Sequence, residues 1–379
     1  MLSCENYTFR GRRAIRLAND VIEVMLLLGG GHVARISFLD LDLNPLWEPP
    51  WATMEPEDYD PKRNPEYGPS EGRLAASLAG HSLCLDHFGE LSPAEVEAGG
   101  YFHGEAPNLP WKVIGQDDQS DSTSLTYGLE LPEAGIRFSR KVTLRPASSI
   151  VWFEEEIENL RRRDVPLEYQ QHVTLGPPFL QGGLTRVGIP GAKGRTFLRS
   201  LGPADRLKPD QDFDWPTAPG RDSDVLVDVF PECDQSYSLC AVLQKESEGE
   251  SFISAWNPRL GLMLGYVFPR DRFPWTALWE ENGGTTDLPY NGRTHAWGIE
   301  FGTTPLPVTR IENLTLGMLF NKQRFRLLPA LGRLRTKYRA FLLKIPEDWR
   351  RVDKIVEIGT KLYVCDSLSG HQLAVSFGG

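Results

Sequence analysis

Three short segments of the chain carry side chains that can exchange protons. His103 is followed by Gly104 in a loop rich in proline, asparagine and aromatic residues, which is typical of a presented side chain. His172 lies in a strand-like stretch that ends at a Gly-Pro-Pro turn, and Glu300 lies between two apolar residues in a segment bounded by glycines. Because histidine titrates at about pH 6.5 and glutamate is a matching base, the three groups together favour acid–base chemistry. Singly, each also fits an ordinary role, as a surface histidine or as a glutamate on the outer face of a strand.

A second group of side chains lies at Trp279, Glu280 and Glu281. A tryptophan beside carboxylates is a frequent platform for carbohydrates, because sugar C–H faces stack on the ring while the acids bind hydroxyls. The same residues also fit a core tryptophan next to a charged turn. A carboxylate pair formed by Glu280 or Glu281 with Glu300 would instead suit a sugar lyase or hydrolase.

Other familiar site patterns are missing from the sequence. The seven histidines show no HExxH or His-x-His spacing and the five cysteines form no CxxC pair, so we expect neither a metal centre nor a disulfide framework. Three glycines at 29–31 follow an apolar run, but they lack the rest of a phosphate-binding loop and predict a tight turn between strands. The cysteine content favours a reducing compartment, and we expect a cytoplasmic protein.

The overall composition restricts the class of partner. The chain has 379 residues, with 41 Lys and Arg against 51 Asp and Glu, which gives a formal net charge of −10. Nucleic acids and anionic membranes are bound by basic surfaces, so we expect neither as the main partner. The N-terminal residues contain no long apolar stretch, so we expect neither a signal peptide nor a membrane span.

β-Strands must position these side chains, because the dominant hydrophobic period of the sequence is two. Strands are expected over 136–144, 150–157, 225–230, 237–243, 252–256, 262–268 and 331–343. Helical signals are few, the clearest being a capping box with Ser92 at the N-cap and Glu95 three residues later. With 36 glycines and 29 prolines marking frequent turns, the pattern predicts an all-β protein built as a large antiparallel sandwich.

Two proline-rich or acidic segments, 46–70 and 202–224, are expected to form long loops, and long ordered loops are often functional. The stretch 322–354 is strongly basic. A solvated strand face is the preferred interpretation of this charge, and a polyanion site is the alternative.

The chain resembles the galactose mutarotase-like (aldose 1-epimerase) superfamily. His103-Gly104, His172 and the segment that begins at Glu300 match the family's His-Gly loop, second histidine and late glutamate in order and rough spacing, and Gly72-Arg73 is similar to its early Gly-Arg element. The resemblance spans most of the chain, from residue 30 to residue 305. It implies one β supersandwich domain over residues 1–379, with few short helices, a monosaccharide or related sugar as ligand, and a monomer or homodimer.

The resemblance also implies a role for each site residue. Glu300 would take the proton of the anomeric hydroxyl, and His172 would protonate the ring oxygen and open the ring. His103 would hydrogen-bond the sugar and Arg73 would orient a hydroxyl, and no metal or organic cofactor is needed. Glu300 and His172 are then expected to face one cleft within about 6–7 Å of each other, with room for the C1–O5 unit of a sugar and a hydrogen bond at each end.

The sequence also departs from the family's motifs. The family's second histidine usually lies in an Asn-His-(Ser/Thr)-Tyr-Phe-Asn strand, whereas here Gln171 precedes it and Val173 follows it. The late motif is usually Leu-Glu-Thr-Gln and here reads Ile-Glu-Phe-Gly. A sugar-binding aspartate of the family has no clear counterpart. Two alternatives therefore remain, namely a carbohydrate-binding domain without catalysis and a lyase or hydrolase with a carboxylate pair.

Overall fold

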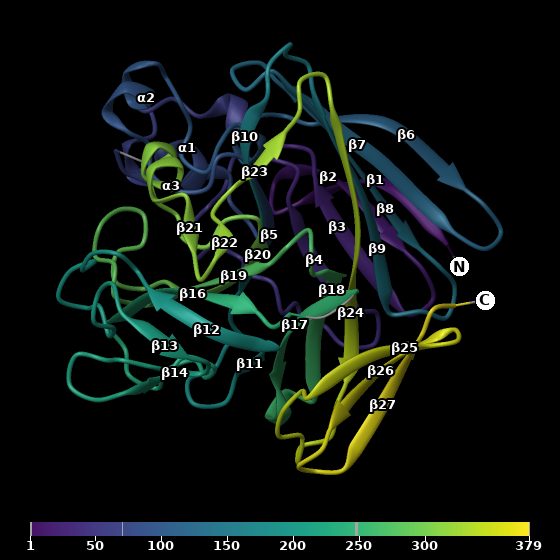
Figure 1. Cartoon of the computed structure of the whole chain (residues 1–379). Coiled ribbons are helices and arrows are strands. Elements are labelled where there is room, and N and C mark those ends of the chain that lie inside the picture. Colours follow the sequence, from purple (N-terminus) through teal and green to yellow (C-terminus); the bar gives the residue numbers. More distant parts are fainter. Residues whose placement is uncertain (1, 70, 247–248, 379) are drawn as a thin grey trace.

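Two large antiparallel sheets face each other across the core of the molecule. The structure is a computed structural model that describes residues 2–69, 71–246 and 249–378 (Figure 1). The first sheet contains, in spatial order, β1 (Ser3–Phe9), β2 (Arg12–Ala18), β3 (Ile22–Leu27), β4 (Val33–Phe38), β5 (His81–Asp86), β10 (Val165–Leu175), β20 (His295–Gly302), β19 (Trp275–Asn282), β16 (Ser236–Gln244), β12 (Gly191–Thr196), β13 (Asp212–Asp214), β14 (Thr217–Ala218) and β15 (Val225–Leu226), with β23 (Arg326–Leu328) paired to β10.

The second sheet packs face to face against the first and supplies the other half of the core. Its strands are, in spatial order, β11 (Arg186–Gly188), β17 (Glu250–Asn257), β18 (Leu262–Pro269), β24 (Arg333–Lys344), β9 (Ile150–Asn159), β8 (Ile136–Leu144), β7 (Thr123–Leu131) and β6 (Lys112–Asp118). Inward side chains from both sheets, such as Leu83, Tyr169 and Phe301 from the first and Phe138 and Phe153 from the second, form one apolar cluster. The predicted all-β antiparallel sandwich is therefore confirmed.

The helices are short and lie in the connections. They are α1 (Gly72–Ser77), α2 (Pro93–Glu97), α3 (Arg310–Leu316) and the 3-10 turns η1 (Pro56–Asp58), η2 (Pro65–Tyr67), η3 (Ala106–Asn108) and η4 (Pro258–Leu260). A small hairpin joins β21 (Met318–Leu319) to β22 (Lys322–Gln323). The predicted capping box is present in α2, where Ser92 and Glu95 hydrogen-bond each other's backbone. Among the helices of the described residues, none has the length and apolar character needed to cross a membrane.

Most of the predicted strands form, and one is cut short. The strand expected over 225–230 covers only Val225–Leu226, because the chain then turns inward and buries Val227 and Phe230 in the core. The strand expected over 331–343 is β24, whose exposed basic residues face glutamates of β9 across the sheet. Lys337 Nζ lies 2.7 Å from Glu154, for example. This part of the basic stretch is a solvated strand face.

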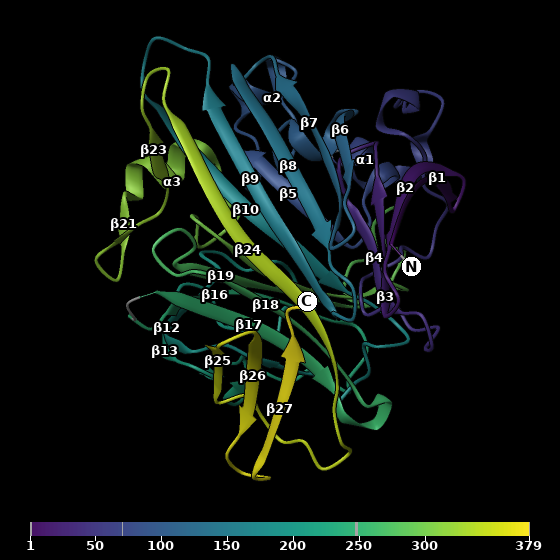
Figure 2. The ribbon, with the colours of Figure 1, turned by 90° about the vertical axis from the view of Figure 1, so that its right-hand side faces the viewer.

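A third sheet at the C-terminal end covers the outer face of the second sheet. It consists of β25 (Lys354–Ile358), β26 (Lys361–Asp366) and β27 (His371–Ser376) and lies at the lower end of the view in Figure 2. Val364 of this sheet and Trp349 before it pack against Trp256, Met263 and Phe341 of the second sheet. This layer leaves the outer face of the first sheet uncovered, and the candidate site lies there.

Candidate active site on the outer face of the first sheet

Strand β10 runs through the centre of the first sheet, and the side chains on its two faces have different roles. Its odd-numbered residues, including Tyr169 and Val173, pack in the core between the sheets. Successive side chains of a strand point to opposite faces, so Glu168 and His172 point to the outer face. A cavity of about 230 Å³ lies on this face and is lined by His172, His103, Trp279 and Glu300 together with residues of the surrounding loops. The structure thus brings four of the six predicted site residues together.

His172 and Glu300 form the floor of this cavity as neighbours on adjacent strands. Gln171 of β10 pairs with Phe301 of β20 in an antiparallel register, which places His172 opposite Glu300. His172 Nε2 lies 3.2 Å from Glu300 Oε1. Both residues thus face one cleft and lie within the expected distance of about 6–7 Å of each other. Directly opposed residues of an antiparallel pair have Cβ atoms only about 5 Å apart, so their side chains meet.

Two small structural features fix this pair. A Cβ atom at Gly298 would lie 2.4 Å from Glu300 Oε1, so only glycine leaves room for the carboxyl group in this position. On the other side, His172 Nδ1 lies 3.0 Å from the hydroxyl of Thr174, which orients the imidazole ring. The two strands that carry His172 and Glu300 therefore also carry Thr174 and Gly298, the residues that hold the pair in place.

Burial sets the protonation of the pair. It raises the pKa of Glu300 well above its usual range, and it lowers the pKa of His172 to about 4. Burial thus favours the uncharged form of both groups, and one proton is available across the 3.2 Å contact. Glu300 Oε2 is buried and has no hydrogen-bond partner within the described residues. This atom is open to a ligand that donates a hydrogen bond.

His103 reaches the cavity from a turn and is held by aromatic contacts. It has a left-handed backbone, with φ at 60°, and Gly104 follows with φ at 81°. Its ring stacks on Phe88 with centroids 5.4 Å apart and meets the ring of His172 edge-on at 5.3 Å. Burial lowers the pKa of His103 well below its usual range, so this ring is neutral. Its position beside His172 suits a hydrogen bond to a ligand.

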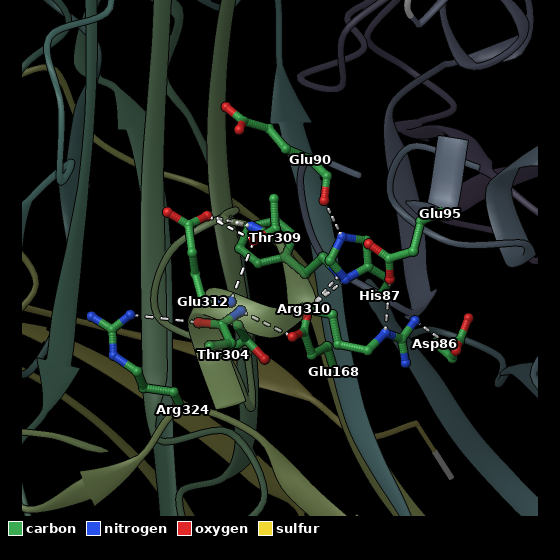
Figure 3. A network of polar contacts seen from close by, with 12 residues as sticks. Asp86, His87, Glu90, Glu95, Glu168, Thr304, Thr309, Arg310, Glu312 and Arg324 are labelled. Atoms are coloured by element: carbon green, nitrogen blue, oxygen red, sulfur yellow. Dashed lines mark hydrogen bonds and ion pairs between the residues drawn. The ribbon is translucent and has the colours of Figure 1, made fainter. Parts of the chain in front are cut away.

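A buried polar network surrounds Glu168 and His87 (Figure 3). It also holds Phe88, on whose ring His103 stacks. Glu168 Oε2 lies 2.9 Å from His87 Nδ1 and accepts a hydrogen bond from the Phe88 amide at 2.8 Å. Asn313 donates to the other oxygen of Glu168 at 2.9 Å. Burial lowers the pKa of His87, but the hydrogen bond and charge of Glu168 outweigh it, and the net pKa is raised. This second histidine–glutamate pair is therefore charged and has a structural role.

Two predicted ligand contacts are corrected by the structure. The guanidinium of Arg73 donates to the Pro56 carbonyl at 2.6 Å and packs over the ring of Tyr59, and it does not line the cavity. Glu280 points to the opposite face of β19 from Trp279 and forms an ion pair with Arg206. The alternation of side chains along β19 explains this, because adjacent residues of a strand cannot face the same cavity.

The carboxylate pair proposed for a lyase or hydrolase is absent from the cavity within the described residues. Glu281 accepts a hydrogen bond from the Thr285 amide at 3.0 Å and, like Glu280, does not line the cavity with Glu300. No group of three or more His, Cys, Asp or Glu residues in the described parts of the chain is placed to hold a metal ion.

Several residues that line the cavity were not predicted from the sequence. Glu71, at the N-terminal end of α1, lines the cavity together with Tyr237 and Tyr290. Burial, assisted by the charge of Glu90, raises the pKa of Glu71 to about 7. Glu71 directly precedes the Gly72-Arg73 element, so the correct segment could be found from the sequence, but not the residue that faces the ligand.

Comparison with solved structures identifies the fold. No protein-family model matches the sequence, and no curated protein matches it either. A proposed aldose 1-epimerase from Klebsiella pneumoniae subsp. pneumoniae has a TM-score of 0.65 at 14% identity, over 88% of this chain and 80% of the other. A galactose mutarotase-like protein from Clostridium acetobutylicum has a TM-score of 0.60 at 15% identity, over 91% and 99%. A proposed mutarotase from Salmonella typhimurium has a TM-score of 0.56 at 13% identity, over 90% and 94%.

These identities are too low to carry an activity from one protein to another. They agree with the departures of the sequence motifs around His172 and Glu300, which indicate a divergent branch. The similarity in backbone nevertheless extends over about nine tenths of the chain. The chain has the galactose mutarotase-like fold.

Proposed function

We propose that the chain is a sugar 1-epimerase, an enzyme that interconverts the two anomers of an aldose. The observation that carries this proposal is the contact of 3.2 Å between His172 and Glu300 on the floor of the cavity. Interconversion of anomers needs one group that removes a proton and a second that supplies one, and both must lie within hydrogen-bond reach of the sugar. A buried histidine–glutamate pair that holds one mobile proton meets this requirement.

The reaction uses the two groups in turn. The pair begins with the proton on His172, a tautomer reached from the neutral pair by transfer of one proton across the contact. Glu300 takes the proton of the C1 hydroxyl while His172 gives its proton to the ring oxygen. The C1–O5 bond breaks, and a carbonyl forms between C1 and O1. After rotation about C1–C2, the same transfers in reverse close the ring as the other anomer, with no net oxidation.

The remaining cavity residues hold the sugar during this exchange. His103 lies beside His172 and provides a neutral imidazole for a hydroxyl. The ring of Trp279 lies 6.0 Å from that of His172, which places a flat apolar surface next to the pair. Sugar C–H groups pack on such surfaces, while the hydroxyls find the few polar groups. Proton exchange of this kind needs no metal or organic cofactor.

The test is the rate at which freshly dissolved α-galactose and α-glucose reach anomeric equilibrium, followed by polarimetry. We expect a large acceleration by the wild-type protein and a loss of about 10²–10⁴-fold in Glu300→Gln, the range of general acid–base catalysis. Glu357→Gln, the same change on the exposed C-terminal sheet, should act like wild type. Sugar binding without acceleration, unchanged in Glu300→Gln, would instead indicate a carbohydrate-binding domain.

A further inference from the structure

The walls of the cavity have an uneven distribution of charge. Three carboxyl groups line it, those of Glu71, Glu90 and Glu300. Among the described residues that line it, none is an arginine or a lysine. A cavity with this lining offers acceptors for hydroxyl groups, but no cation for a phosphate or a carboxylate.

The arginines nearest to the cavity are engaged elsewhere. Arg199 forms ion pairs with Glu90 and, at 3.1 Å, with Glu312. Arg206 is paired with Glu280 on the far side of β19. Recognition of an anionic group normally uses an arginine fork or a lysine with free donors. Neither of these arginines has its charge free for that purpose.

Glu71 is the carboxylate in the cavity whose side chain has no polar partner among the described residues. Its side chain has no ion pair and no hydrogen bond among the described residues, whereas Glu90 is paired with Arg199. Its carboxylate also lies within charge reach of other cavity groups. Burial raises the pKa of Tyr237, and the charge of Glu71 raises it further. Glu71 therefore acts on the same enclosed space as the reacting pair.

We propose that Glu71 is a specificity-determining residue, which accepts a hydrogen bond from a sugar hydroxyl and excludes sugars that carry a phosphate or a carboxylate. The substrate class of the site is then an uncharged aldose. This inference takes the ligand to be a sugar from the proposed function, but it concerns binding rather than proton transfer. A negative group on the ligand would lie in the same cavity as the Glu71 carboxylate, and like charges repel each other.

The experiment measures the dissociation constants of glucose, glucose 6-phosphate and glucuronate by isothermal titration, with saturation-transfer NMR for weak binding, at pH 8.5, where Glu71 with its pKa of about 7 is charged. In the wild type we expect glucose to bind at least about tenfold more tightly than either anion, since like-charge juxtaposition costs more than the 1.4 kcal/mol that a factor of ten represents. Glu71→Gln removes the charge and keeps the shape. It should reduce this preference at least about threefold, whereas Glu71→Asp keeps the charge and should retain it.

Glu357→Gln serves as the matched control, because it changes the net charge equally on a distant surface. Tighter binding of either anion than of glucose would overturn the proposal, as would an unchanged preference in a folded Glu71→Gln protein. Failure of all three sugars to bind at millimolar concentration would overturn it too. If the order of binding holds but no anomer is interconverted faster, the proposed function fails and this inference stands. If anomers of the phosphorylated sugar are interconverted fastest, the function stands and this inference fails.

Discussion

Strand β10 carries one member of each of two buried histidine–glutamate pairs. One pair is uncharged, whereas the other is an ion pair. Glu168 and His172 lie on the same face of the strand, about 13 Å apart at the usual rise per residue. Burial raises the pKa of Glu300 and lowers that of His172, so that pair is neutral. In the other pair the pKa of His87 is raised despite burial, because Glu168 holds its proton.

The number of hydrogen-bond partners explains the difference. Besides His87, Glu168 accepts from the Phe88 amide and from Asn313, so both of its oxygens are satisfied. The second nitrogen of His87 lies 2.6 Å from the Glu90 carbonyl. Glu300 has one contact, to His172, and its second oxygen has no partner in the described residues. A buried ion pair is stable only when the remaining hydrogen-bonding positions are filled.

The comparison shows that two neighbouring histidine–glutamate pairs have different roles, one structural and one suited to proton exchange. In the pair at Glu168 both carboxylate oxygens accept hydrogen bonds from the protein, so neither is left open for a ligand. The unsatisfied pair retains a mobile proton and an open acceptor, and it faces the cavity. Chemically identical side chains therefore take different roles according to how many donors the neighbouring backbone and side chains supply.

Glu168→Gln tests the structural pair and should have the largest effect on stability. It leaves a charged imidazole without its carboxylate inside the protein, which costs about 3 kcal/mol in the free energy of unfolding. Urea unfolding at pH 6 measures this cost. Glu357→Gln is the control and should stay within about 0.5 kcal/mol of the wild type. A loss of less than about 1 kcal/mol would mean that the His87–Glu168 pair is not charged.

The pH dependence of stability should fall in different pH ranges for the two pairs. The raised pKa of Glu300 means that the unfolded chain loses this proton first, so the wild type loses stability as pH rises above about 4.5. Glu300→Gln removes this loss, and its relative stability should increase by up to about 1.4 kcal/mol per pH unit above that point. The raised pKa of His87 stabilises the fold below about pH 6.5, and this contribution fades at higher pH.

The measurement is a series of urea unfolding curves from pH 4 to 8 for the wild type, Glu300→Gln and Glu168→Gln. The cost of Glu168→Gln should shrink as pH rises, while the benefit of Glu300→Gln should grow. A benefit of Glu300→Gln that stays constant over this range, or a cost of Glu168→Gln that does not shrink, would contradict the charge states assigned to the two pairs.

The sequence predicts the framework of this region better than its geometry. Half-buried strands such as β8 and β24 alternate clearly, so their positions could be read from the chain. The alignment of His172 with Glu300 depends on which strands become neighbours and in what register, and local sequence does not contain that information. Glu71 directly follows the proline-rich segment 46–70, which has no periodic pattern, so the sequence did not indicate which way its side chain points.

One error could have been avoided from the sequence alone. Trp279 and Glu280 are adjacent in a strand, and the period of two forbids both from facing one cavity. The error at Arg73 could not have been avoided in this way, because α1 is too short for a periodic pattern to reveal which of its side chains faces the cavity. The family resemblance identified the two reacting residues, but only the structure could reveal their contact.

The smallest expected effect concerns the orientation of the histidine in the reacting pair. Thr174→Val keeps the shape but removes the hydroxyl that lies 3.0 Å from His172 Nδ1. Loss of one neutral hydrogen bond is worth about 1 kcal/mol, so we expect the anomer interconversion rate to fall about fivefold while glucose binds as before. Thr174→Ser keeps the hydroxyl and should restore the rate. If valine and serine behaved alike, the ring of His172 would be held by its contact with Glu300 alone, and the reacting pair would need no third member, unlike the multiply bonded pair at Glu168.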